Sequence, residues 1–145
     1  GGILLFIKKN IQIISSEMSK EFEILHCKVR INNNSKLISI IAGYKPPVVN
    51  NQNFISEVER IVDSVIGCVD DCIIAGDLNM NMFDESNELI NFCESFGFQN
   101  TVSKGTRLNY KTMHKTLLDV ILILCFDLFL TSEVFEYSNS DHWLV

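Results

Sequence analysis

The spacing of apolar and polar positions changes along the chain, and each change predicts a different element. Apolar runs at residues 3–7 and 11–14 flank the polar triplet at residues 8–10, which predicts a β-hairpin. Residues 22–31 alternate apolar and polar side chains, as in an antiparallel strand with one exposed face. Residues 37–44 are almost wholly apolar and predict a strand buried on both faces, which the two prolines after it would end.

Helical spacing replaces this pattern twice. Apolar residues recur every three or four positions over residues 51–66, which predicts an amphipathic helix. Asn50 or Asn51 is its expected N-cap, and Gly67 its expected end. A shorter apolar stripe precedes Gly97 and predicts a second helix that stops at that glycine.

Strand-like runs lie between and after the two helices. One apolar run begins at residue 72 and ends abruptly at Asp77, as expected of a buried strand. Residues 98–106 form a short irregular passage, and residues 109–115 are a polar stretch. Residues 117–124 and 129–135 after them are also β-rich. This order of elements predicts a layered α/β or α+β fold with mixed sheets, and 145 residues fit one domain.

Composition excludes some classes of protein. Hydrophobic residues at 47% and aromatics at 10% exclude a disordered tail. The formal net charge of −6 argues against a generally basic nucleic-acid coat, while a local basic groove or a carboxylate metal centre stays open. The five cysteines, without C-x-x-C spacing, predict reduced thiols in an intracellular protein. Asp119 and Asp127 interrupt the longest apolar run, so buried strands are expected there rather than a membrane helix.

Asp77 and Asn79 lie two positions apart where the strand ends. In a strand, alternate side chains share a face, so these two would present an acid and an amide to the same space. Gly76 before them allows close approach of backbone or ligand. Such a pair suits hydrolysis, because one group can hold or deprotonate water and the other can stabilise negative charge. A simple turn explains the same residues, since Asp and Asn are common turn formers.

Further candidates lie near the end of the chain. Asp119 sits inside an apolar run, where a charge is costly unless it is paired. Asp141 and His142 lie where a polar loop enters an apolar segment. A carboxylate beside an imidazole fixes its tautomer, so Asp119 holding His142 is a physical hypothesis; the alternative is that Asp119 bonds only to backbone. Tyr44 ends a buried strand and either reaches the same cleft or rests at the core rim. A loose basic cluster, which contacts phosphates or forms a solvated loop, contains Lys104, Arg107, Lys111 and Lys115.

Five short motifs follow one another in the chain. They are GGILLFIKK from Gly1, AGYKPP from Ala42, IAGDLN from Ile74, TLLDVIL from Thr116 and SDHWLV from Ser140. Each motif is weak alone, but five in this order, with the intervening elements, are specific. Together they resemble the endonuclease/exonuclease/phosphatase superfamily, and specifically the apurinic-endonuclease-like domain of non-LTR retrotransposons.

This resemblance implies a fold and a reaction. The implied fold is a four-layered α/β sandwich, with two mixed sheets face to face and helices outside. The implied reaction is phosphodiester cleavage with Mg²⁺ or Mn²⁺, in which Asp77 positions or deprotonates the attacking water and Asn79 holds the nucleophile and transition state. His142 would contact the scissile phosphate while Asp119 orients it. The remaining implied roles are metal binding by Asp141 and donation to a phosphate oxygen by Tyr44. From the basic cluster, and not from the resemblance, Arg107 and Lys111 are the substrate-binding candidates.

The resemblance also implies partners and a departure from the family pattern. In the retrotransposon branch a nick in DNA, made in the nucleus, supplies the 3′-hydroxyl that primes a reverse transcriptase encoded downstream. The family places an Asn and a metal-binding Glu upstream of the segment that resembles Gly1-Gly2-Ile3. We therefore expect residues 1–145 to be a partial domain, incomplete at both ends and inactive alone. The alternatives are another phosphodiesterase or phosphatase of the superfamily, or a non-catalytic relic or binding module of the same fold.

Overall fold

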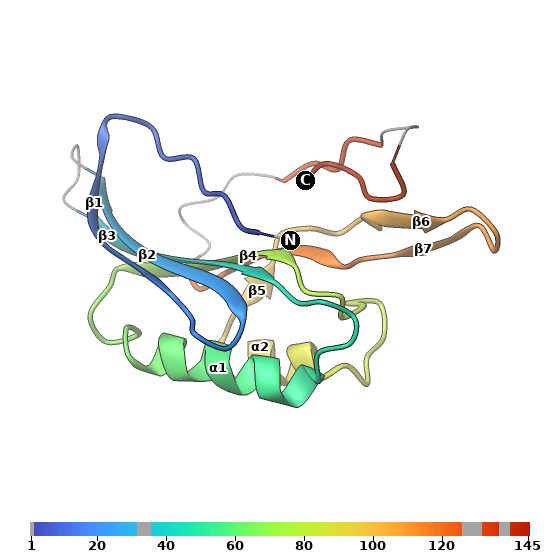
Figure 1. Cartoon of the computed structure of the whole chain (residues 1–145), viewed down its shortest axis with the longest axis horizontal. Helices are drawn as coiled ribbons and strands as arrows, with labels where there is room; N and C mark the ends of the chain where they lie inside the picture. Colours follow the sequence, from blue (N-terminus) through green and yellow to red (C-terminus); the bar gives the residue numbers. More distant parts are fainter. Residues whose placement is uncertain (1, 32–35, 126–131, 137–139) are drawn as a thin grey trace.

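The computed structural model describes residues 2–31, 36–125, 132–136 and 140–145. One mixed six-stranded sheet, in the order β1-β2-β3-β4-β8-β5, forms the centre of the fold, and β6 and β7 form a separate two-stranded sheet (Figure 1). Within the large sheet β3 and β4 are parallel and the other neighbours are antiparallel. The elements are β1 (Ile11–Met18), β2 (Glu23–Ile31), β3 (Lys36–Tyr44), α1 (Asn51–Asp63), β4 (Asp71–Asp77), α2 (Glu88–Phe96), β5 (Gln99–Asn100), β6 (Arg107–Asn109), β7 (His114–Thr116) and β8 (Asp119–Ile123).

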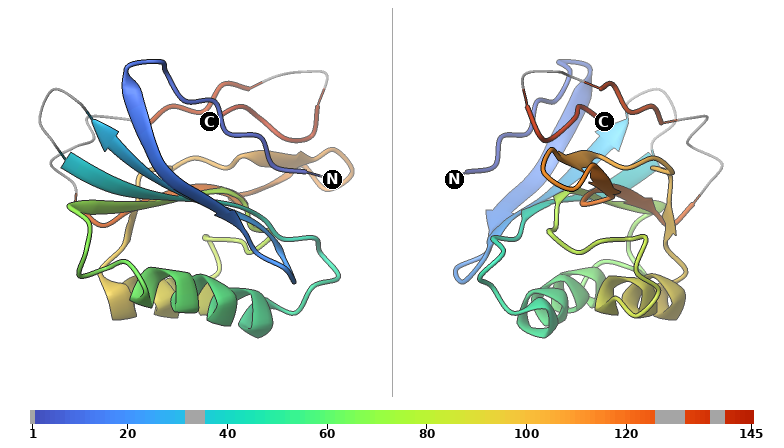
Figure 2. Two further views of the ribbon diagram at one scale, coloured as in Figure 1. Left: turned by 60° about the vertical axis from the view of Figure 1, so that its left-hand side comes forward. Right: turned by 90° about the vertical axis from the view of Figure 1, so that its right-hand side faces the viewer.

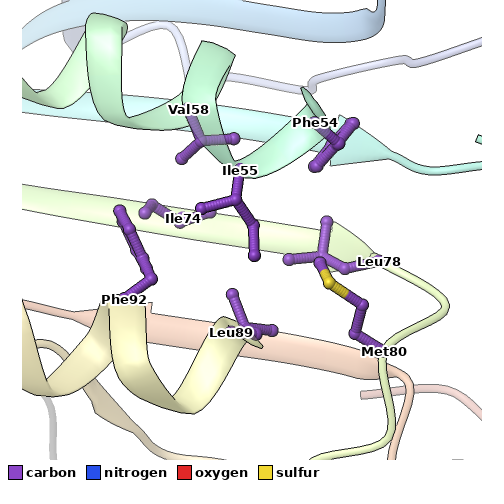
Figure 3. A pocket seen from close by; sticks show the side chains of 8 residues that line it. All are labelled: Phe54, Ile55, Val58, Ile74, Leu78, Met80, Leu89 and Phe92. Atoms are coloured by element: carbon purple, nitrogen blue, oxygen red, sulfur yellow. The ribbon is translucent and has the colours of Figure 1, made fainter. Parts of the chain in front are cut away.

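The layers confirm the predicted α/β class with a mixed sheet, while the small second sheet is purely antiparallel. Figures 1 and 2 show both helices on one side of the large sheet, with the β6–β7 hairpin and the C-terminal segment on the other. The main core lies between the helices and the sheet. Figure 3 shows a small apolar pocket there, lined by Phe54, Ile55, Val58, Ile74, Leu78, Met80, Leu89 and Phe92. Burial of these side chains is the main force that fixes the helices on the sheet.

The helix ends follow the sequence only in part. Asn50, one of the two expected N-caps, accepts a hydrogen bond from the backbone N–H of Asn53 and starts α1. Gly97 ends α2 in the left-handed conformation, at φ 80°, as predicted. The expectation that Gly67 ends α1 is wrong. Ser64 is the C-cap, and its hydroxyl donates to the carbonyl of Ile61 at 2.6 Å, so the helix ends earlier.

The predicted hairpin of residues 3–7 with residues 11–14 is also wrong. Residues 2–10 form no strand, and β1 pairs instead with β2 in antiparallel register. Leu5 and Ile7 pack against the apolar cluster on the sheet face that the helices leave uncovered. The alternate apolar side chains of this segment are therefore buried by packing on a sheet face, and this packing does not require the segment to pair as a strand.

The region after α2 differs from the sequence prediction in one place. β8 confirms the strand expected at residues 117–124. The polar stretch of residues 109–115, for which the sequence predicts no element, belongs to the β6–β7 hairpin, whose short polar strands leave no apolar alternation to detect. The strand expected at residues 129–135 falls largely outside the described residues.

The sheet register brings distant residues to one edge. β3 and β4 run parallel, so Tyr44 and Asp77 end their strands at the same edge. β8 runs antiparallel to β4, and its first residue, Asp119, pairs directly with Asp77. Two acidic residues that are far apart in sequence therefore become neighbours at the end of the central strands.

Gly76 allows the two central strands to approach each other closely. Its φ is +140°, and a Cβ at this position would lie 1.9 Å from the carbonyl oxygen of Gly43 in β3. No other residue type fits this combination of conformation and contact. The glycine before Asp77 therefore shapes the strand end from which the acid projects.

Candidate active site

Three titratable side chains meet where β4 ends and β8 begins. Nδ1 of His142 lies 3.1 Å from Oδ2 of Asp119 and 3.9 Å from Oδ2 of Asp77. One possible ligand atom from each of the three lies within 4.8 Å of the others. The side chains are 19–31% exposed, so they are partly shielded but open to a ligand. The structure thus brings together three of the residues that the sequence predicts for the site.

The segment from Asp77 to Asn79 is both a strand end and a turn. The backbone N–H of Asn79 donates to Oδ1 of Asp77 at 3.0 Å, and Asn79 adopts φ 47°. Asn tolerates this left-handed conformation better than most residues. Nδ2 of Asn79 donates to the carbonyl of Lys45 at 2.9 Å. The two interpretations of this stretch left open by the sequence are therefore compatible, because the turn is what presents the amide beside the acid.

Burial affects the charge of the Asp77 carboxyl. Removal from water raises its pKa above the ordinary value, and the nearby Asp119 charge acts in the same direction. The Asn79 N–H, His142 and Arg107 partly oppose the rise. A carboxyl with a raised pKa is a better proton acceptor once it is ionised.

Backbone pairing with β6 holds His142 in place. Residues Arg107 and His142 form an antiparallel bridge. The N–H of Leu108 donates to the carbonyl of Asp141 at 2.8 Å, and the N–H of Trp143 donates to the carbonyl of Thr106 at 2.7 Å. The imidazole is therefore positioned by main-chain hydrogen bonds on both sides of it.

Thr106 is a site residue that the sequence did not reveal. It is fully buried, and its hydroxyl oxygen accepts hydrogen bonds from the N–H groups of Leu118, at 3.1 Å, and Asp119, at 3.0 Å. Together with its bond to Trp143, this links the start of β8 to the segment that carries His142. A single threonine in a polar stretch gives no signal for this role, which depends on contacts distant in sequence.

The other predicted site residues lie around this cluster. Oδ2 of Asp141 accepts from Nε of Arg107 at 3.1 Å, and this bond lowers the pKa of the Asp141 carboxyl. Asp141 is thus engaged with Arg107 rather than grouped with the three clustered side chains. Lys111 is exposed at the tip of the β6–β7 hairpin. Tyr44 is half-buried at the end of β3. The roles of these four residues stay predictions.

The donor atoms of the cluster fit a hard divalent cation in part. Mg²⁺ and Mn²⁺ prefer oxygen ligands, which the Asp77 and Asp119 carboxylates offer. Nδ1 of His142 is already hydrogen-bonded to Asp119, so this nitrogen is the least available of the three ligand atoms. Two carboxylates and one oriented imidazole can together activate water and bind an anion.

Comparison with protein families assigns the chain. The family model described as "Endonuclease-reverse transcriptase" matches residues 38–145, which include every residue of the site. This chain belongs to that family. The endonuclease-reverse transcriptase family lies within the endonuclease/exonuclease/phosphatase fold, whose members are hydrolytic enzymes. No curated protein matches the sequence.

Solved structures agree with this assignment at the level of fold. The endonuclease domain of TRAS1, a telomere-specific non-LTR retrotransposon, is 13% identical, with a TM-score of 0.64 over 94% of this chain and 76% of that domain. A humanised D. rerio TDP2 is 13% identical (TM-score 0.59; 92% and 65% covered). The Bacteroides thetaiotaomicron mannosyl-6-phosphatase Bt3783 is 11% identical (TM-score 0.56; 79% and 53% covered). This member of the endonuclease-reverse transcriptase family therefore spans less than two thirds of the latter two proteins.

The described part of the chain has no helix both long and apolar enough to cross a membrane.

Proposed function

We propose that this chain is the nuclease part of an endonuclease-reverse transcriptase protein and that it nicks DNA by metal-dependent hydrolysis. The observation that carries the proposal is the cluster of Asp77, Asp119 and His142 at the strand ends. Membership in the endonuclease-reverse transcriptase family supports DNA as the substrate. The structural likeness to the TRAS1 endonuclease domain supports the proposal at the level of the fold, because the two chains have a similar architecture.

Asp77 and Asn79 handle the attacking water in the proposed reaction. The water oxygen attacks phosphorus, the bond from phosphorus to the 3′-oxygen breaks, and the proton of the water passes to the Asp77 carboxylate. The departing 3′-oxygen takes a proton from solvent. Because Nδ2 of Asn79 is bound to the Lys45 carbonyl, its Oδ1 is left to accept a hydrogen bond from the water.

His142 and Asp119 act on the phosphate. Nδ1–H of the imidazole donates to Asp119, which leaves Nε2 directed away from this pair. A protonated Nε2 donates to a phosphate oxygen as negative charge builds up. Tyr44 is the proposed second donor, from the end of the neighbouring strand. Arg107 and Lys111 are proposed to contact the DNA backbone from the β6–β7 hairpin.

A divalent ion completes the proposed chemistry. When bound, Mg²⁺ or Mn²⁺ supplies positive charge to the phosphate oxygens. Asp77 and Asp119 are the carboxylates of the cluster that fit it, and Asp141 is the further ligand expected from the resemblance. The nick leaves a 3′-hydroxyl, which a reverse transcriptase in the same polyprotein extends.

A plasmid-nicking assay tests this function. Supercoiled plasmid is incubated with Mg²⁺ and the polypeptide extended through its upstream coding sequence, since this chain spans 76% of the TRAS1 endonuclease domain. We expect open-circular product that EDTA abolishes. Asp77→Ala and His142→Ala should each slow nicking by roughly a thousandfold. Asp63→Asn, which changes an exposed carboxylate at the end of α1, is the matched control and should nick normally. Plasmid left intact by the folded, extended protein would point instead to a non-catalytic relic.

A further inference from the structure

Lys45 is a fully buried lysine at the edge of the candidate active site. It follows Tyr44 at the end of β3 and is 1% exposed. Its Nζ donates to the carbonyl of Val49 at 3.1 Å and to that of Pro46 at 3.4 Å. Burial lowers the pKa of the Lys45 amine, while the charges of Asp77 and Glu88 raise it. A buried ammonium is costly without such partners, so the Lys45 side chain is expected to keep its hydrogen bonds to the turn that follows it.

The peptide groups of Lys45 contact both members of the acid and amide pair. Its backbone N–H donates to the carbonyl of Asp77 at 3.0 Å. Its carbonyl accepts from Nδ2 of Asn79 at 2.9 Å. One residue of β3's loop thus holds the backbone of the predicted base and the side chain of the predicted water-binding amide.

We propose that Lys45 is a positioning residue for the nuclease reaction, acting through the orientation of the Asn79 carboxamide. This inference rests on the proposed function. The ammonium ties down the turn of residues 45–49, which a hydrogen bond from the Val49 N–H to the Pro46 carbonyl also closes, at 3.0 Å. The fixed turn keeps the Lys45 carbonyl directed at Nδ2, and this selects the amide orientation in which Oδ1 faces the attacking water.

Loss of the ammonium should release this chain of contacts. Without Nζ, the carbonyl of Val49 loses its side-chain donor and that of Pro46 keeps only the Val49 N–H, so fewer hydrogen bonds hold the turn. The turn then no longer fixes the Lys45 carbonyl, so the Asn79 amide rotates more freely. Small displacements of this kind reduce turnover more than they reduce binding, because substrate contacts remain.

The test compares Lys45→Met with Lys9→Met in the extended polypeptide. Methionine has a similar length but donates no hydrogen bond, and Lys9 is exposed before β1, so Lys9→Met is the matched control. The first readout is the side-chain amide signal of Asn79 in NMR spectra, identified by its loss in Asn79→Asp. We expect this signal to shift and to exchange faster with water in Lys45→Met only. The second readout is nicking: kcat should fall by roughly tenfold to a hundredfold with KM nearly unchanged.

Three results would overturn the inference. One is an unchanged Asn79 amide signal in folded Lys45→Met, and another is a change in KM with kcat intact, which would mark a direct substrate contact. The third result concerns the wild-type protein and decides the matter if Lys45→Met does not fold. It is an Asn79 side-chain amide whose protons exchange with water as fast as those of an exposed asparagine. The NMR readouts need no nicking, so the two failures can be told apart. A protein that leaves DNA intact while its Asn79 signal responds to Lys45→Met would refute the proposed function but keep the orientation of the Asn79 amide by Lys45.

Discussion

Asp77 and His142 arrive at the same cluster from two regions that are built in different ways. In the first region, the β4 half, Asp77, Asn79 and Lys45 are joined by contacts within one turn or between ends of adjacent parallel strands. In the second, the C-terminal half, the segment of His142 is held by backbone hydrogen bonds to the β6 strand and to Thr106, which directly precedes that strand. The first is supported by the core of the fold, and the second by hydrogen bonds across a long stretch of intervening chain.

This difference shows how one site can combine two kinds of stability. The β4 half is expected to unfold only together with the large sheet, because Asp77 is the last residue of a central strand. The C-terminal half rests on Thr106 and a short hairpin, so it can be released without unfolding the sheet. Three predictions test this division, from the largest expected effect to the smallest.

Gly76→Ala should disrupt the β4 half and the fold with it. The added Cβ would meet the Gly43 carbonyl at 1.9 Å, in a backbone conformation that alanine rarely adopts. We expect a loss of more than about 4 kcal/mol in the free energy of unfolding, measured by chemical denaturation. Gly67→Ala is the control, since no atom lies within 4 Å of its added Cβ, and should cost no more than about 0.5 kcal/mol. Equal stability of the two variants would contradict the close strand approach.

Thr106→Val should release the C-terminal half alone. Valine keeps the volume but removes the oxygen that accepts from the Leu118 and Asp119 N–H groups, which should cost about 1–3 kcal/mol of stability. Nicking should fall sharply, while the Asn79 amide signal stays in place. Thr106→Ser retains the hydroxyl and should preserve most of the activity. If serine and valine at this position behave alike, the hydroxyl does not hold the two segments together.

Asp77→Asn should produce the smallest of the three changes in stability, and this change should be an increase. Because the folded protein raises the pKa of this carboxyl, the native state prefers it protonated, so ionisation at neutral pH destabilises the wild type. Asparagine removes that cost, and the melting temperature at pH 7 should rise while nicking is lost. The gain should shrink as pH falls through the raised folded-state pKa, and it should vanish below the unfolded-state pKa, where aspartate is protonated in both states. A variant less stable than the wild type at pH 7 would show that Asp77 is stabilised by its neighbours instead.

The sequence predicts the parts of this fold that depend on local pattern. Apolar spacing identifies β2, β3, β4, α1, α2 and β8, and Gly97 marks a helix end because its backbone conformation favours glycine. The acid and amide at Asp77 and Asn79 can likewise be recognised because they end an apolar strand. All of these signals lie within a few residues of the feature they predict.

The parts that the sequence could not predict depend on distant contacts. The β6–β7 hairpin has no apolar alternation, and the role of Thr106 arises only when two segments converge on its hydroxyl. Residues 3–7 have the pattern of a strand, but pack on a sheet face instead. Lys45 reads as an ordinary surface lysine, because nothing near it in the sequence shows that the turn encloses its side chain.

The antiparallel pairing of β4 with β8 also has a consequence for how the protein can vary. Asp77 and Asp119 are fixed to each other by the ladder itself, whatever the length of the chain that joins them. Insertions at the tip of the β6–β7 hairpin or among the exposed residues 83–86 would lengthen surface loops without changing the spacing of the two carboxylates. The fold thus separates the proposed catalytic cluster from surface loops whose length can change.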